Sequence, residues 1–152
     1  MFEKASREVV VERERIAARV RDELAAAGLG ATGSSAVFGM LLGQGPEITV
    51  DEGDDAAGGV VVRWQCHPVL RQRAMDAFAR GTAQDPALAH HAAVQRAMLA
   101  AITTVLASAG FEVVDNPDDM DPVTLKVVSA PDPGTAMTWE LPQAGSSGAT
   151  EA

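Results

Sequence analysis

Four residues of this chain have the side chains that most often bind transition metals or act as nucleophiles: Cys66, His67, His90 and His91. A structural zinc site would need all four, because it takes four nitrogen or sulfur ligands. Neighbouring residues of a strand point to opposite faces, so Cys66 and His67 are badly placed to share one ion. The spacing matches neither Cys-x-x-Cys nor His-x-x-x-His. We therefore expect no metal and no cofactor.

The same four residues, together with Trp64, are candidates to line a pocket between a sheet and its helices. In that alternative the chain is a small enzyme or a ligand-binding protein, with Cys66 as nucleophile and a histidine as base. A thiol on the apolar face of a strand is more often buried and inert. The sequence also matches no Gly-x-Ser-x-Gly elbow, phosphate-binding loop or dinucleotide fingerprint. An enzyme is therefore the weaker hypothesis.

Acidic residues gather in two short clusters. The first contains Asp51, Glu52, Asp54 and Asp55, and the second contains Asp115, Asp118, Asp119 and Asp121. Neither has the alternating aspartates, central glycine and closing glutamate of a calcium loop. Aspartate is also common in turns, because its side chain bonds nearby backbone. If the two turns lie side by side, they form one acidic rim that could bind a basic partner.

The charge of the chain argues against nucleic acid as a partner. The net charge is −9, and residues 1–28 are neutral, so the acidity belongs to the rest of the chain. An acidic body repels phosphate backbones. The longest apolar runs are far shorter than the ~20 residues that span a bilayer. The start of the chain lacks the pattern of a signal peptide, and the single Cys66 cannot form an internal disulfide, so we expect a cytoplasmic protein.

The longest helix signal runs from Asp85 to Phe111. Asp85 followed by a proline is a typical helix start. Gly110 can take the left-handed position that ends the helix, with Phe111 packed back on Leu106. Apolar residues recur at helical spacing between these ends: Val94, Met98, Ile102, Val105 and Leu106. Because the opposite side is rich in alanine, we expect this helix to be largely buried.

The remaining periodicities predict helices and strands on both sides of this helix. A helix over 3–27 has its apolar face at Val9, Ile16, Val20 and Leu24. Residues 35–42 are a strand or a short helix, 47–51 and 60–65 form a hairpin, and 68–80 is a helix with Leu70, Ala74, Ala77 and Phe78 inside. Residues 112–114 and 123–128 alternate as strands, and Met137, Trp139 and Leu141 suggest a last edge strand.

These elements predict an α+β fold: an antiparallel sheet of four to six strands packed against about three helices, in the order α-β-β(-β)-α-α-β-β(-β). We expect one domain over 1–141 and a disordered tail over 142–152. In layout this order resembles the small acidic chaperones of secretion systems.

The leading functional hypothesis is a non-enzymatic protein-protein interaction module, such as a chaperone, adaptor or regulator. The alanine-rich second side of the central helix would leave apolar surface uncovered. A two-fold copy is the commonest partner for such a surface, so we expect a homodimer. The acidic rim would then remain available to a basic target.

Titration with zinc or calcium is expected to leave the melting temperature unchanged, because neither candidate ligand set is complete. A ligand that binds only the folded state stabilises it by about 2.7 kcal/mol at 100 times its dissociation constant. A thermal-shift assay detects that change easily. A clear rise with micromolar metal would contradict the interpretation of the histidines or of the acidic clusters.

Overall fold

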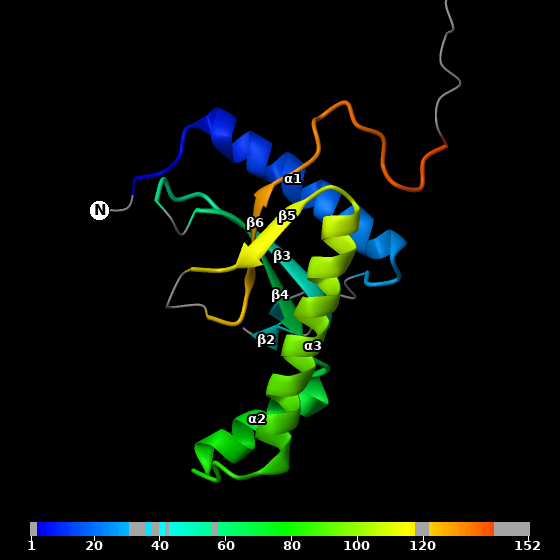
Figure 1. Cartoon of the computed structure of the whole chain (residues 1–152). Helices are drawn as coiled ribbons and strands as arrows, with labels where there is room; N and C mark the ends of the chain where they lie inside the picture. The colour runs from blue at the N-terminus through cyan, green and yellow to red at the C-terminus, as the bar shows by residue number, and fades with distance from the viewer. Residues whose placement is uncertain are drawn as a thin grey trace, which may run out of the picture.

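The computed structural model describes residues 3–30, 36–37, 40–41, 43–55, 58–117 and 122–141. Figure 1 shows the elements in chain order: α1 (Arg7–Ala26), β1 (Ala36–Val37), β2 (Met40–Leu41), β3 (Gly45–Asp51), β4 (Gly59–Gln65), α2 (Pro68–Ala79), α3 (Pro86–Ser108), β5 (Glu112–Asp115) and β6 (Leu125–Ser129). The predicted α+β class and its order of helices and strands are confirmed. The predicted tail, 142–152, lies outside the described residues.

The main sheet has four antiparallel strands in the order β3-β4-β6-β5. The predicted hairpin is present, with Val50 opposite Val60 across β3 and β4. β1 and β2 pair with each other in a separate two-stranded hairpin. For residues 36–37 and 40–41, the open choice between strand and helix is therefore decided in favour of strand.

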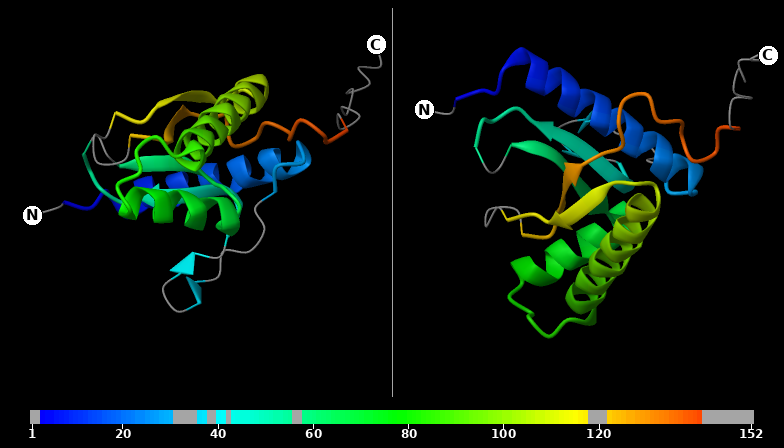
Figure 2. Two further views of the ribbon diagram at one scale, coloured as in Figure 1. Left: turned by 90° about the horizontal axis from the view of Figure 1, so that it is seen from below. Right: turned by 45° about the horizontal axis from the view of Figure 1, so that its top comes forward.

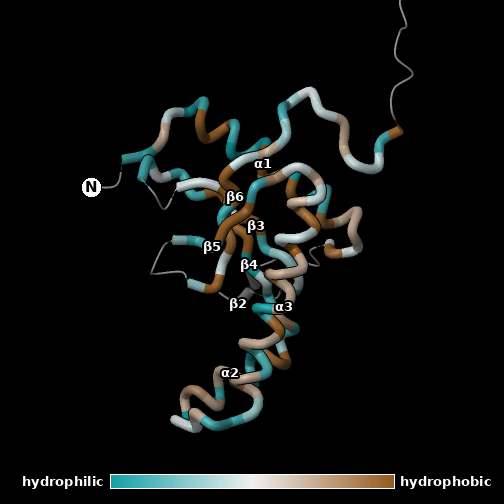
Figure 3. Tube along the Cα trace, viewed as in Figure 1, coloured by the Kyte–Doolittle hydropathy of each residue, from teal (hydrophilic) through white to brown (hydrophobic). Residues whose placement is uncertain are grey.

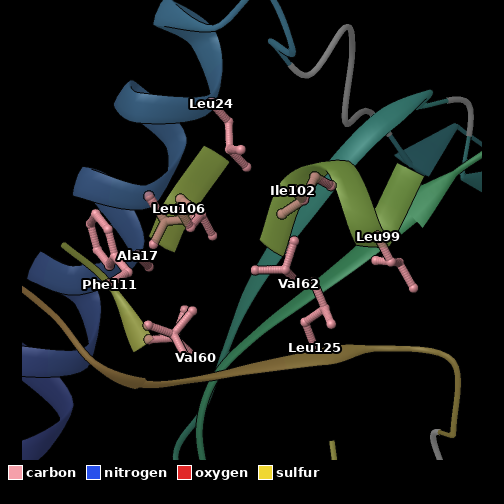
Figure 4. Packing of buried hydrophobic residues seen from close by; sticks show 11 residues of the cluster. Ala17, Leu24, Val60, Val62, Leu99, Ile102, Leu106, Phe111 and Leu125 are labelled. Carbon is pink, nitrogen blue, oxygen red and sulfur yellow. The ribbon is translucent and has the colours of Figure 1, made fainter. Parts of the chain in front are cut away.

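Two helices cover one face of the sheet. α1 packs on β3 and β4, α3 packs on β4 and β5, and the two helices touch each other. Figure 4 shows the resulting core, in which Val60 and Val62 of β4 meet Ile102 and Leu106 of α3. In Figure 3 the central strands are mostly hydrophobic, while hydrophilic and hydrophobic residues alternate along α1. Burial of these aliphatic side chains supplies the main stabilisation, at roughly 25 cal/mol per Å² of apolar surface.

Each helix ends with the same local arrangement around a glycine with positive φ. After α3, Gly110 has φ 90°, and the N–H of Phe111 donates to the carbonyl of Leu106 at 3.0 Å. This is the predicted Schellman cap, and Phe111 is buried beside Leu106 in the core. Gly28 after α1 and Gly81 after α2 have the same arrangement.

The start of α1 differs from the prediction. The helix begins at Arg7, not at Glu3, because the Oγ of Ser6 accepts a hydrogen bond from the N–H of Val9 and serves as the N-cap. The residues before it are extended and pair with the acidic turn, where the N–H of Ala5 donates to the carbonyl of Glu52. Val9, which was predicted on the apolar face of the helix, lies in its first turn and is exposed.

The expectation that the central helix is largely buried is also wrong. In α3 the buried residues are Leu99, Ile102 and Leu106, and the alanines of the opposite side are exposed. Leu99 was absent from the predicted stripe. The sheet covers only one side of α3. Because α1 contacts α3 on that same side, the alanine side stays uncovered. None of the helices in the described ranges has the length and apolar character needed to cross a membrane.

Residues 131–141 form a strap across α1 and not the predicted edge strand (Figure 1). Arg19 donates from its two terminal nitrogens to the carbonyls of Thr135 and Ala136, at 2.7 and 3.0 Å. The Glu23 carboxylate accepts from the N–H and hydroxyl of Thr138. Arg19 and Glu23 have the i, i+4 spacing of a charge pair on a solvated helix, but only 8% and 3% of their surfaces are exposed.

Replacing Gly110 with alanine is expected to destabilise the fold by more than Gly28→Ala. Both glycines have positive φ, which costs a residue with a side chain about 1–2 kcal/mol. At Gly110 a new Cβ would also lie 3.2 Å from Cγ of Pro131, whereas at Gly28 nothing lies within 4 Å. Urea denaturation of both variants measures the difference.

Gly134→Ala is the matched control, because a Cβ there meets nothing within 4 Å and φ is not positive. Its stability is expected to stay within about 0.5 kcal/mol of the parent. Equal stability of all three variants would contradict the assigned role of the caps.

Candidate functional site

The helices α2 and α3 form a hairpin that extends beyond the end of the sheet (Figure 1). Along α3, the stripe that faces inward reads Leu88, His91, Gln95, Leu99, Ile102, Leu106, at spacings of three and four. Its second half packs on the sheet as part of the core. Its first half lies past the sheet and faces α2. The same side of one helix therefore serves the core at one end and an open surface at the other.

An open groove of about 500 Å³ lies between α2 and α3, next to the end of β4. A volume of this size is typical of ligand and peptide sites. Two of its lining residues, Phe78 and Met75, are strongly exposed, with 80% and 65% of their surfaces accessible to solvent. The groove is lined by Gln65, Arg71, Ala74, Met75, Phe78, Ala79, Leu88, His91 and Gln95.

Arg71 is held in the groove wall by a chain of hydrogen bonds that starts on the sheet. Its NH1 donates to Oε1 of Gln65 at 3.0 Å, and its NH2 donates to the carbonyl of Gly43 at 2.9 Å. Gln65 in turn donates to the Glu47 carboxylate, which also pairs with Arg63. The positive charge of Arg71 is thus fixed in place before any partner arrives.

Two titratable side chains near the groove, His91 and Cys66, have pKa values shifted toward their neutral forms. Burial lowers the pKa of His91, and the nearby Arg71 charge lowers it further. Burial raises the pKa of the Cys66 thiol, an effect that Arg71 partly offsets. A neutral, buried thiol is a poor nucleophile. The raised pKa of the thiol therefore argues against Cys66 as the nucleophile of the alternative hypothesis.

The structure brings only one of the five predicted pocket residues to the groove, namely His91. Trp64 is half-buried against the core and Cys66 is buried. Nδ1 of His67 accepts from the N–H of Val69 at 3.1 Å, so this histidine is the N-cap of α2. His90 is exposed and does not line the groove.

Sequence reasoning missed the apolar walls of the groove. Phe78 was assigned to the inner face of its helix together with Ala74, which is indeed buried. Ala74 and Phe78 are four residues apart, so the helical period places them next to each other on the same side of α2. Only the packing shows that α3 covers Ala74 and leaves Phe78 open, so periodicity alone held no usable signal.

The first acidic cluster belongs to a tightly bonded turn between β3 and β4. Oδ1 of Asp51 accepts from the N–H of Gly53 at 2.8 Å, and Glu52 pairs with Lys4 at 3.3 Å. NH1 of Arg13 donates to the carbonyls of Asp51 and Gly53. These contacts give the cluster a structural role in closing the turn. Asp54 and Asp55 are exposed on it.

The second cluster is only partly described. Asp115 is exposed at the end of β5, while Asp118, Asp119 and Asp121 lie outside the described residues. β6 begins at Leu125 opposite Val62, in the middle of β4, whereas the first turn joins β4 at its first residue, Gly59, so the two connections are set apart along that strand. The single acidic rim stays a prediction. Among the described residues, no three His, Cys, Asp or Glu side chains are grouped to hold a metal ion.

His91→Gln is expected to reduce the loss of stability in mild acid. Because the pKa of folded His91 is lowered from 6.5, the unfolded chain binds the proton more readily. The free energy of unfolding therefore falls as the pH drops below 6.5, until the folded protein is protonated as well. Urea denaturation above and below pH 6.5 measures the slope. His90→Gln is the control at an exposed position, and an identical slope in His91→Gln and the parent would contradict the assignment.

Comparisons of the chain with protein-family models, with curated proteins and with solved structures find no significant match. The geometry of the groove and of the turns is therefore the basis for the function proposed below.

Proposed function

We propose that this chain is a non-enzymatic protein-protein interaction module that binds an apolar segment of a protein partner in the groove between α2 and α3. The single observation that carries the proposal is the exposed Phe78 and Met75 at the mouth of that groove. An exposed phenylalanine in contact with a concave apolar surface is costly in water and typical of interaction sites.

The shape of the groove supports a protein segment as its occupant. Aromatic and methionine side chains are enriched at the centre of protein interfaces, and methionine adapts to varied partners. Four apolar residues of α2 line the groove together with Leu88 of α3: Ala74, Met75, Phe78 and Ala79. A partner that inserts apolar side chains would cover these residues. An arrangement of that kind serves an adaptor or a chaperone.

The chemistry near the groove supports binding without catalysis. Cys66 is buried with a raised pKa, and His67 is engaged as a helix cap. Among the residues that line the groove, His91 therefore has no nucleophilic side chain beside it. A free and buried Cys66 also suits a reducing compartment, so we place the module in the cytoplasm.

A second candidate is a binder of small molecules in the same groove. The observation that favours it is the convergence of Arg71, His91 and Gln95 on a volume of about 500 Å³. This candidate would need the ligand to leave Phe78 largely uncovered or to extend along it. The protein partner is the better proposal because it accounts for the exposure of both Phe78 and Met75.

Site-specific photocrosslinking in the native host tests the proposal. A photoreactive phenylalanine analogue at position 78 is expected to capture a protein, because this side chain lies at the mouth of the groove. The matched control carries the analogue at Val69, which is 71% exposed on the same helix but does not line the groove. We expect capture at position 78 and little at position 69.

Phe78→Asp should then abolish co-purification of the captured protein while the melting temperature stays close to that of the parent, because the side chain is exposed. Equal capture at both positions would indicate non-specific contact. Turnover or binding of a small molecule that depends on His91, with no captured protein, would replace the proposal with the second candidate.

A further inference from the structure

The charges of the chain are divided between the helical hairpin and the body. The hairpin, 68–108, contains four arginines and two aspartates, a net charge of +2. Since the whole chain carries −9, the rest carries −11. Because the hairpin and the body carry net charges of opposite sign, a contact between the hairpin of one copy and the body of another is favoured. The segment that fills the groove is therefore expected to be acidic.

The end of the strap has the chemistry that the groove requires. Trp139 and Leu141 are 49% and 86% exposed, and the carboxylate of Glu140 lies between them in the sequence. The other exposed large apolar residues outside the groove are valines, most of them within helices or strands. A tryptophan is among the residues that most often anchor an interface. Two large apolar side chains around a carboxylate suit an apolar groove on a basic hairpin.

The strap holds this segment away from the groove of its own chain. Arg19 and Glu23 fix residues 135–138 against α1 through four hydrogen bonds, three to backbone groups and one to the Thr138 hydroxyl. In every view of Figures 1 and 2, the end of the strap lies apart from α2. The groove of the same molecule is thus out of reach. The fixed backbone also lowers the entropy lost when Trp139 and Leu141 are ordered by a partner.

We infer that the groove between α2 and α3 takes residues 139–141 of a second copy of this chain. This inference rests on the proposed function and names the partner for it. In a two-fold dimer each strap would fill the groove of the other chain, so the contact forms twice and closes. The dimer would then be held through the strap and the hairpin, and not by the alanine side of α3.

Sedimentation equilibrium of the full chain is the first measurement, with twice the 15.8 kDa mass expected. Phe78→Asp blocks the groove, and the double variant Trp139→Ser, Leu141→Ser removes the segment. Each is expected to weaken the dimer by at least about tenfold in Kd. Val69→Asp, exposed outside the groove, is expected to dimerise like the parent. The four substituted side chains are all about half exposed or more, so the substitutions should not disturb the core. Circular dichroism verifies that every variant is folded.

Mixing the two weakened variants gives the decisive result. The Phe78→Asp chain retains an intact strap, and the double variant retains an intact groove, so one of the two contacts can form again. We expect a heterodimer tighter than either variant alone and weaker than the parent. Added salt should weaken the parent dimer, because the charges on the two surfaces are exposed.

The second copy as partner would be overturned by a parent chain that stays monomeric or by a double variant that dimerises like the parent. A mixture that forms no heterodimer would do the same. If the parent is monomeric while position 78 still crosslinks to another host protein, the proposed function stands and only the inferred partner is wrong. If position 78 captures nothing, neither this chain nor another, both proposals fail.

Discussion

The structure depends on one constraint: the inward stripe of α3 is longer than the sheet it covers. Ile102 and Leu106 pack on β4 together with α1, and this contact forms the hydrophobic core. At the other end of the helix, Leu88 and His91 face α2, and among the residues that line the groove only Gln65 belongs to the sheet. A helix that rises 1.5 Å per residue gains about 35 Å over its 23 residues, which exceeds the ~20 Å length of a typical strand. The groove is a direct consequence of that excess length.

Polar groups fix the parts of the chain that the core does not reach. Arg19 and Glu23 are buried beneath the strap. Arg19 binds the backbone of the strap, and Glu23 accepts from the N–H and hydroxyl of Thr138. Nε of Arg19 has no hydrogen-bond partner among the described residues. Such contacts are specific in geometry, because an unpaired buried charge would cost several kcal/mol. The chain from Glu47 through Gln65 to Arg71 has the same role beside the groove. In both places polar side chains position a surface that apolar packing leaves open.

The division of charge gives the two ends of the molecule different properties. The acidic turn between β3 and β4 uses part of its acidity internally, through Asp51 and the Glu52–Lys4 pair. The hairpin has a small excess of arginine, of which Arg73 is paired with Asp85 at 2.7 Å. Exposed pairs of this kind add little stability. Their main effect is on which surfaces approach one another, since the long-range field of a charged protein steers association.

Local physics accounts for what the sequence alone determined. The cap at Gly110, the start at Asp85 and the hairpin of 47–51 and 60–65 depend on residues close together in the sequence, so they could be predicted correctly. The tertiary structure alone decided the burial of Arg19 and Glu23 and the exposure of Phe78. An i, i+4 pair of opposite charges has the same pattern on a solvated helix and under a strap. Phe78 has the same helical phase whether or not a neighbour covers it. Which side of a helix is covered depends on contacts far apart in the sequence, and periodicity carries no information about where the sheet ends.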